Sequence, residues 1–372
     1  GSSKEKVCVQ SVCKPINYCL ALEELGEEYV HQFVGHEPSG KSFNALTLNQ
    51  KGLPHNPMIN SGAIMCCSLI KKDLNIADRF DYVLALWRKS AGGQAISFNN
   101  SVYLSEKQTA DRNFALAYFM KEKKAFPKEI DLLEILDFYF QCCSIEVTTD
   151  AMSVVAGTLA NGGVCPLTGE RIFHPQAVKD CLALISSCGM YDFSGEFAFK
   201  IGLPAKSGVS GLIMIVIPNL LGICVWSPRL DQHGNSVRGI EFCKELTNRY
   251  SFHNYDSLLL GQTSKKDPRL HHDEQAIQGV VALCWAASEG DLMQIQRLLS
   301  SGIDPNAKDY DGRTAMHLAA SEGKLNIIKY LFKHGSQLAP VDRWGGTPLG
   351  DARRHKHKSV IDFFEKEFKK KA

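Results

Sequence analysis

The C-terminal part of the chain repeats itself with a period of 33 residues, and this period restricts the possible folds more than any other feature. Ala286–Gly290 recurs as Ala319–Gly323, and Asp309–Leu318 recurs with substitutions as Asp342–Asp351. A fixed period of this length is typical of small units that stack on one another, because one unit cannot bury its apolar face alone. We therefore expect a stacked helical array from Ile277 to Phe368.

This repeat resembles the ankyrin repeat. The Thr-Pro-Leu-His turn of ankyrin repeats is matched at Thr314–His317 and at Thr347–Gly350. About two and a half repeats are few for independent stability, so the resemblance implies that the array packs against another surface or self-associates. The sequence does not identify a partner for the repeats.

Length and composition predict two domains. A chain of 372 residues with 44% hydrophobic content can bury a large core. We expect a first domain over residues 1–262, a polar linker over 263–276, ankyrin repeats over 277–368 and a basic tail over 369–372. Residues 1–3 begin a Gly-Ser-Ser-Lys start that resembles the remnant of an expression tag.

The composition argues against several classes of function. The net charge is +2, from 42 basic and 40 acidic residues, which gives no electrostatic reason to expect binding to nucleic acid. The most apolar stretch, Gly211–Trp226, is interrupted by Pro218 and is shorter than the ~20 residues that span a bilayer. No cysteine and histidine cluster has the spacing of metal ligands. Neither a membrane span nor a metal site is expected.

The cysteines indicate a reducing compartment. There are 13 cysteines without paired Cys-x-x-Cys spacing, and two adjacent pairs, Cys66-Cys67 and Cys142-Cys143, lie in apolar surroundings. This pattern is typical of buried free thiols.

The first domain combines helical and strand patterns, which predicts an α+β fold. Helices are predicted at Val7–Leu25, Ile76–Ala91, Asp111–Lys123, Ile130–Cys143, Thr148–Leu159, Pro175–Cys188 and Arg238–Tyr250. Strands joined by short turns are predicted at Phe197–Gly202, Leu212–Ile217 and Leu220–Trp226, and they indicate an antiparallel sheet. Loops are expected at Ser42–Asn49, at Ser97–Asn113, which leads into the helix predicted at Asp111–Lys123, and at Gly189–Gly195. Tyr191 would lie at the tip of the last of these loops.

A Ser-x-x-Lys motif at Ser11 and Lys14 is the first candidate for chemistry. On a helix this spacing places both side chains on one face. A lysine amine that is partly shielded from water has a lowered pKa, and it can then take the serine proton to make a nucleophile. The alternative is an ordinary helix start. The motif also occurs at Ser3/Lys6, Ser68/Lys71 and Ser321/Lys324, but only Ser11/Lys14 has apolar residues on both sides.

A second motif, Lys206-Ser207-Gly208, follows on a predicted strand. The two motifs in this order resemble those of the serine β-lactamase and penicillin-binding superfamily, in which both flank one acyl-enzyme site. The chain as a whole is more similar to the animal glutaminases of the kidney and liver mitochondrial type. The similar stretches are Gln10–Pro15, His55–Ile64, Glu106, Asp111–Phe114, Asp137–Ser144, Thr158–Cys165, Ser187–Gly195, Gly202–Val209 and Phe252–Asp256. This resemblance implies a β-lactamase-like catalytic domain followed by an all-α ankyrin domain.

The resemblance implies hydrolysis of the side-chain amide of L-glutamine to glutamate and ammonia. Ser11 would attack the amide carbon and Lys14 would accept its proton. The backbone N–H groups of Ser11 and Val209 would hold the oxyanion. Tyr191 would assist proton transfer to ammonia and from water. No cofactor is implied, but inorganic phosphate is expected as an activator.

Free glutamine has a charged group at each end of its backbone, so a selective site must bind both. Glu106 suits the ammonium, Asn60 and Asn113 can donate to the carboxylate, and Tyr139 would hydrogen-bond the substrate. For Asn60 the alternative is a helix N-cap, and for Glu106 it is a solvated loop acid. Lys206 would either orient the site electrostatically or bridge structural carbonyls, with Ser207 and Gly208 supporting it.

The resemblance also implies assembly and location. Enzymes of this type form tetramers that can build filaments, and they reside in mitochondria, with a targeting segment that this sequence lacks. The helix Asp111–Lys123 would supply the contact between dimers through Phe114, Tyr118 and Phe119. A gating loop would cover Gly40–Leu53.

Some features differ from the family pattern and leave other functions open. The family site has a further tyrosine upstream of the serine, whereas this sequence begins ten residues before Ser11. The Val12-Cys13 pair is often reversed in relatives, and Ala45 occupies a position where relatives often carry lysine. One alternative is a different amidase or β-lactam-interacting hydrolase. Another is an ankyrin scaffold with a degenerate serine hydrolase domain.

Overall fold

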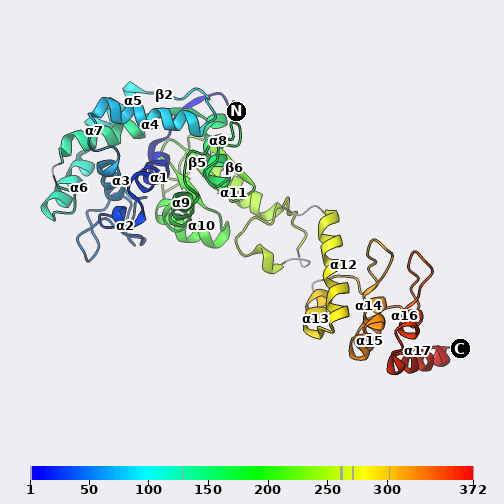
Figure 1. The fold of residues 1–372 in the computed structure, drawn as a ribbon. Helices are drawn as coiled ribbons and strands as arrows, with labels where there is room; N and C mark the ends of the chain where they lie inside the picture. The colour runs from blue at the N-terminus through cyan, green and yellow to red at the C-terminus, as the bar shows by residue number, and fades with distance from the viewer. Residues whose placement is uncertain (1, 129, 260–262, 270–271, 301, 372) are drawn as a thin grey trace. The chain divides into compact units, whose positions relative to one another are not determined.

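A computed structural model describes residues 2–128, 130–259, 263–269, 272–300 and 302–371. The chain forms two compact units, Gly1–Tyr255 and Asp256–Ala372 (Figure 1). Each unit has its own hydrophobic core. The two units are therefore described separately.

Helices make up most of the first unit. They are α1 (Cys13–Leu25), α2 (Glu27–Val30), α3 (Asn60–Leu69), α4 (Ile76–Ser90), α5 (Asn100–Gln108), α6 (Asp111–Glu122), α7 (Leu132–Cys143), α8 (Thr149–Ala160), α9 (Pro175–Cys188), α10 (Ser194–Lys200) and α11 (Val237–Arg249), with the 3₁₀ helices η1 (Gln10–Val12) and η2 (Tyr191–Phe193). Helix α1 is buried on all sides as far as Leu22, and it packs against α3 and α9. A helix this apolar is typical of a domain core.

An antiparallel sheet forms the other layer, as predicted. Its strands are β4 (Ala205–Ser207), β5 (Leu212–Ile217) and β6 (Leu221–Trp226), in the order β4-β5-β6. All residues of β5 are buried, because α8 covers one face of the sheet while Phe197 and Ile240 of α10 and α11 pack on the other. Lys206 pairs with Met214 in this sheet, which places the Lys206-Ser207-Gly208 motif at a strand end.

The predicted first helix is wrong over its first turn and a half. Lys6–Cys8 is strand β1, which pairs antiparallel with β3 (Ile145–Thr148), and β2 (Ser97–Phe98) pairs with the other side of β3. Gln10, the first residue of η1, has a φ of 49°, in the left-handed region, and the chain turns there out of the strand. A short apolar run does not distinguish a buried strand from a buried helix, so the sequence pattern did not reveal this sheet.

Two further segments differ from their predictions. The predicted strand Phe197–Gly202 is mostly helix α10, which buries Phe197 and leaves Phe199 83% exposed. The predicted loop from Ser97 contains helix α5, which begins because the side chain of Asn99 accepts from the N–H of Val102 at 3.0 Å. Glu106 therefore lies on a helix and not in a loop.

The second unit is the predicted array of paired helices. It contains η3 (Asp256–Leu259), α12 (His272–Glu289), α13 (Leu292–Ser300), α14 (Ala315–Ser321), α15 (Leu325–Lys333), α16 (Pro348–Arg354) and α17 (Lys358–Lys371). Thr314 and His317 form a capping box at the start of α14, and Thr347 accepts from the N–H of Gly350 at the start of α16. Helix α12 begins inside the range predicted as a linker, and α17 continues into the predicted basic tail.

Within the described ranges, no helix is both long enough and apolar enough to cross a membrane. All cysteines are free, and all except Cys224 are buried.

Candidate active site

Ser11 and Lys14 meet at the junction of η1 and α1. The Lys14 Nζ atom donates a hydrogen bond to Ser11 Oγ at 2.9 Å. Lys14 is 1% exposed, and burial lowers the pKa of its amine below the ordinary value of 10.5. The charge of Glu106 and those of nearby thiols act in the opposite direction. Burial thus favours the neutral amine, which is the form that can accept a proton from a serine.

Lys14 also belongs to a network that joins four helices, α1, α3, α6 and α7. Its Nζ donates to Asn60 Oδ1 at 2.7 Å, and Asn60 Nδ2 donates to Asn113 Oδ1 at 2.9 Å. The hydroxyl of Tyr139 lies 3.4 Å from the same Asn60 oxygen. The N-cap of α3 is Ile59, so the N-cap alternative for Asn60 is wrong. The amide of Asn60 instead links the lysine to Asn113.

Tyr191 lies in the 3₁₀ helix η2 and is buried, not at an exposed loop tip. Its φ of 54° is in the left-handed region, which is rare for an aromatic residue. Burial raises the pKa of its phenol, and interaction with the side chain of Ser11 lowers it in part. The buried hydroxyl has no hydrogen-bond partner within the described residues. It is therefore available to a bound molecule near Ser11.

Lys206 is fully buried behind this tyrosine. Its Nζ donates to the carbonyl oxygen of Ser207 at 2.8 Å and lies 4.7 Å from the centroid of the Tyr191 ring. Burial lowers the pKa of Lys206 well below its usual range, and the nearby amine of Lys14 lowers it further. Lys206 thus contacts the carbonyl oxygen of Ser207 and the ring of Tyr191, and its two expected roles stay predictions.

Gly208 lets the turn after β4 approach the nucleophile. A Cβ atom at Gly208 would lie 2.8 Å from the carbonyl oxygen of Val9 and 3.2 Å from the side chain of Val12. Only glycine fits this contact without a backbone shift. Val209 comes next, and no acceptor for its N–H is found in the described part of the chain. The turn therefore brings a free backbone donor to the strand end beside η1.

Glu106 is half-buried on α5 and makes no hydrogen bond or ion pair with any described residue. The charge of Glu106 raises the pKa of Lys14 and that of the Cys8 thiol. Glu106 is therefore close enough to Lys14 to act on it electrostatically. The carboxylate is thus free to accept from a cationic group.

The three aromatic residues predicted for an oligomer contact lie on α6, outside this cluster. Phe114 packs against Phe140, with ring centroids 6.1 Å apart. Tyr118 is 52% exposed, and Phe119 is half-buried beside Lys123, whose Nζ lies 5.7 Å from its ring centroid. The aromatic surface of this helix is therefore only partly covered within the chain.

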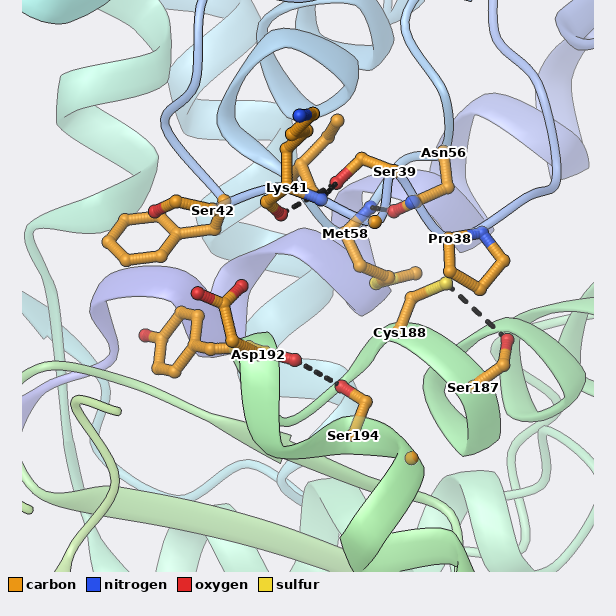
Figure 2. Close-up of a pocket in the computed structure, with 15 residues that line it drawn as sticks. Pro38, Ser39, Lys41, Ser42, Asn56, Met58, Ser187, Cys188, Asp192 and Ser194 are labelled. Atoms are coloured by element: carbon orange, nitrogen blue, oxygen red, sulfur yellow. Dashed lines mark hydrogen bonds between the residues drawn. The ribbon is translucent and has the colours of Figure 1, made fainter. Parts of the chain in front are cut away.

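A cavity of about 500 Å³ adjoins the site (Figure 2). Lys41 and Ser42 of the predicted gating loop, and Ser39 just before it, approach the cavity from one side, while Asp192 and Ser194 lie on the opposite side in Figure 2. Phe43 and Tyr191 also line it, with ring centroids 4.7 Å apart. The sequence predicted the loop but not its contact with Tyr191, because no local pattern links residues so far apart.

The α+β fold and the buried Ser–Lys pair are typical of serine acyl-transfer enzymes. A family model described as Glutaminase matches residues 1–255, and one described as Ankyrin repeats (many copies) matches residues 283–332. The chain therefore belongs to the glutaminase family and carries ankyrin repeats.

Individual relatives agree with this assignment. A putative glutaminase 2 of Caenorhabditis elegans is 50% identical over 372 residues, and the mitochondrial liver isoform of glutaminase from Rattus norvegicus is 49% identical over 367 residues. These matches cover 100% and 98% of this chain, but only 61% of each relative. A crystal structure of a Bacillus glutaminase superposes with a TM-score of 0.62 at 33% identity, over 65% of this chain and 83% of that one.

Proposed function

We propose that the chain hydrolyses the side-chain amide of L-glutamine to L-glutamate and ammonia. The observation that carries this proposal is the 2.9 Å contact between Lys14 Nζ and Ser11 Oγ, with Lys14 buried so that its pKa is lowered. A neutral amine at this distance is a general base for the serine hydroxyl. Family membership supports glutamine as the substrate.

The reaction proceeds through an acyl-enzyme. Ser11 Oγ forms a bond to the amide carbon while its proton passes to Lys14. The C–N bond then breaks, and the nitrogen takes a proton and leaves as ammonia. Water attacks the ester and releases glutamate. The free phenol of Tyr191 is suited to move a proton at both stages, because no described residue occupies its hydroxyl.

The tetrahedral intermediates carry negative charge on the former amide oxygen. We assign the N–H groups of Ser11 and Val209 to this oxyanion. The close packing of Gly208 against Val9 supports the pairing, since it brings the turn with Val209 to η1. Loss of one such donor typically costs about 2.7–4 kcal/mol of transition-state stabilisation.

Recognition of the free amino acid uses the polar groups around Lys14. The unpaired carboxylate of Glu106 binds the substrate ammonium. The amide hydrogens of Asn60 and Asn113 that remain free bind the substrate carboxylate, and Tyr139 adds a hydroxyl close to Asn60. Both ends of glutamine are then bound, which a β-lactam or a simple amide would not require.

We further propose that the protein is activated by inorganic phosphate, forms homotetramers that can build filaments, and resides in mitochondria. The rat relative is described as mitochondrial, which supports the location. The exposed aromatic side of α6 supports a contact between copies.

Release of ammonia from L-glutamine by the full chain tests this function, with and without phosphate. We expect turnover in the parent and none above background in Ser11→Ala, because the nucleophile is lost. Ser321→Ala is a matched control, since it removes the serine of a Ser-x-x-Lys motif in the ankyrin repeats. Ammonia release by Ser11→Ala at the parent rate would exclude the mechanism. A folded parent without activity would favour the scaffold alternative.

A further inference from the structure

Two short segments that are distant in the sequence meet beside the proposed nucleophile. We call Met190–Phe193 the tyrosine turn, because it carries Tyr191. We call Asp231–Asn235 the clamp loop; it leads directly into α11. The clamp loop contains none of the residues that sequence analysis assigned to the site.

The tyrosine turn requires support from its surroundings. Tyr191 adopts a φ of 54°, a backbone conformation that persists in a non-glycine residue only where the surrounding structure holds it. Its hydroxyl has no hydrogen-bond partner in the part of the chain that the structure describes. The position of the hydroxyl therefore depends on contacts with the backbone and ring. Ser194 supplies some of them, since its Oγ accepts from the N–H of Met190 and donates to the carbonyl of Tyr191.

The clamp loop supplies further contacts to the tyrosine turn through three consecutive residues. Asn235 Nδ2 donates to the carbonyl oxygen of Met190 at 3.3 Å. The backbone of Gly234 lies against the edge of the Tyr191 ring, because a Cβ atom there would be 3.7 Å from two ring carbons. The ring of His233 stacks on that of Phe193, with centroids 5.6 Å apart.

The clamp loop is itself closed by hydrogen bonds, so it can act as a fixed support. Asp231 Oδ1 accepts from the N–H groups of His233 and Asn235, at 2.8 Å and 3.0 Å. The N–H of Asp231 donates to the carbonyl of Asn235 at 2.8 Å. The next residue, Ser236, caps α11 by accepting from the N–H of Gly239 at 3.1 Å. Asn235 is 0% exposed, so its side chain has little freedom to turn away.

We propose that Asn235 is a positioning residue for the reaction: through Met190 it holds the tyrosine turn so that the Tyr191 hydroxyl reaches Ser11. This inference rests on the proposed function, in which Tyr191 moves protons. Asn235 acts through the turn and not by contact with the substrate. Loss of Asn235 should therefore lower kcat and leave KM nearly unchanged, because a small misplacement of a proton-transfer group slows the chemical step much more than it weakens substrate binding.

A double-mutant cycle with Tyr191→Phe separates positioning from general damage. We expect Asn235→Ala to lower kcat by about 10- to 100-fold, with KM changed by less than about twofold. In the Tyr191→Phe background the same change should lower kcat by less than about threefold, because the hydroxyl it positions is already absent. Asn248→Ala, on the exposed side of α11, is the matched control and should leave kcat unchanged.

Equal losses of kcat in the two backgrounds would overturn the proposal, as would a parental kcat in Asn235→Ala. If Asn235→Ala does not fold by circular dichroism, His233→Ala takes its place in the cycle, because it removes the ring stack on Phe193 and one exposed contact with Gln232 while leaving the backbone hydrogen bonds of the clamp loop in place. A parent without glutaminase activity would instead count against the proposed function. In that case a 3-fluorotyrosine placed at position 191 still tests the clamp: one narrow ¹⁹F line should broaden or split in Asn235→Ala, and an unchanged line would overturn the proposal.

Discussion

At the scale of single residues, the site depends on two lysines that are buried close to each other. Burial lowers the pKa of both amines, and the proximity of Lys14 lowers that of Lys206 further. Glu106 acts in the opposite direction on Lys14. The pKa of Lys14 is thus a balance between desolvation, which lowers it, and the acidic groups around it, which raise it: the thiols of Cys143 and Cys13 and the carboxylate of Glu106.

This balance predicts the pH dependence of the reaction. In the proposed mechanism neutral Lys14 is the active form, so kcat should fall as the pH is lowered through a pKa that lies below 10.5. In Glu106→Gln the carboxylate no longer raises this pKa, so the fall in kcat should move to lower pH, with an increase in KM. Initial rates over a range of glutamine concentrations at each pH give both kcat and KM and so measure both effects.

Lys14→Arg is the control for the pH profile, because arginine is a long basic side chain that stays protonated at every pH and so cannot accept the serine proton. We expect its kcat to be lower than that of the parent by about 10²- to 10⁴-fold at every pH. A shift of the Glu106→Gln profile to higher pH would contradict the assignment of Lys14 as the base.

At the scale of elements, the site is a junction between a 3₁₀ helix and a strand turn. The left-handed conformation of Gln10 ends β1 and starts η1, which presents Ser11. From the other side, Gly208 allows the turn after β4 to lie against Val9. Neither element carries the site alone, so its geometry depends on how closely they pack.

Gly208→Ala tests this packing. The new Cβ would lie 2.8 Å from a backbone oxygen, which cannot rotate away, so η1 and the turn must separate. We expect a loss of at least about 10²-fold in kcat/KM, since misplacement by ~1 Å has such effects. Steady-state kinetics measure it.

Gly195→Ala is the matched control for Gly208→Ala. It adds the same methyl group to helix α10, where, apart from the adjacent helical backbone, no atom lies within 4 Å of the new carbon, so the methyl enters open space at the wall of the cavity. Its activity should stay at the parent level, and its unfolding free energy should rise by up to about 0.5–1 kcal/mol. Parental kcat/KM in Gly208→Ala would show that the close approach is not required.

At the scale of the whole molecule, the surface of α6 is the feature that bears on the proposed contact between copies of the chain. Tyr118 and part of Phe119 are left uncovered by the chain's own residues, and a partly apolar helix face of this kind suits a contact between copies. Phe114 packs instead against Phe140 of α7, so it holds α6 against the rest of the unit.

We expect Phe119→Ala to weaken tetramers, because it removes apolar area from the proposed contact. Sedimentation velocity over a range of protein concentrations should show a larger fraction of dimers than in the parent. Leu133→Ala, which removes a 55% exposed apolar side chain from α7, is the control and should leave the distribution unchanged. Unchanged tetramers in Phe119→Ala would place the contact elsewhere.

The sequence alone determined the features that repeat locally or have a regular period. The ankyrin array follows from the 33-residue period, and the antiparallel sheet follows from the strand pattern around Pro218. The Ser-x-x-Lys spacing by itself indicated that Ser11 and Lys14 could meet, because three residues of separation place both on one side of a helical turn.

Only the tertiary structure decided the contacts that surround this pair. The sheet of β1, β2 and β3, the burial of Lys14, and the support of Tyr191 by Lys206 and the clamp loop all join segments far apart in the chain. Sequence periodicity reports on neighbours along one element, whereas burial and pKa depend on which other elements pack around a group. For that reason the contact between Ser11 and Lys14 could be predicted from the sequence, but the contacts of Asn235 and Gly234 with the tyrosine turn could not.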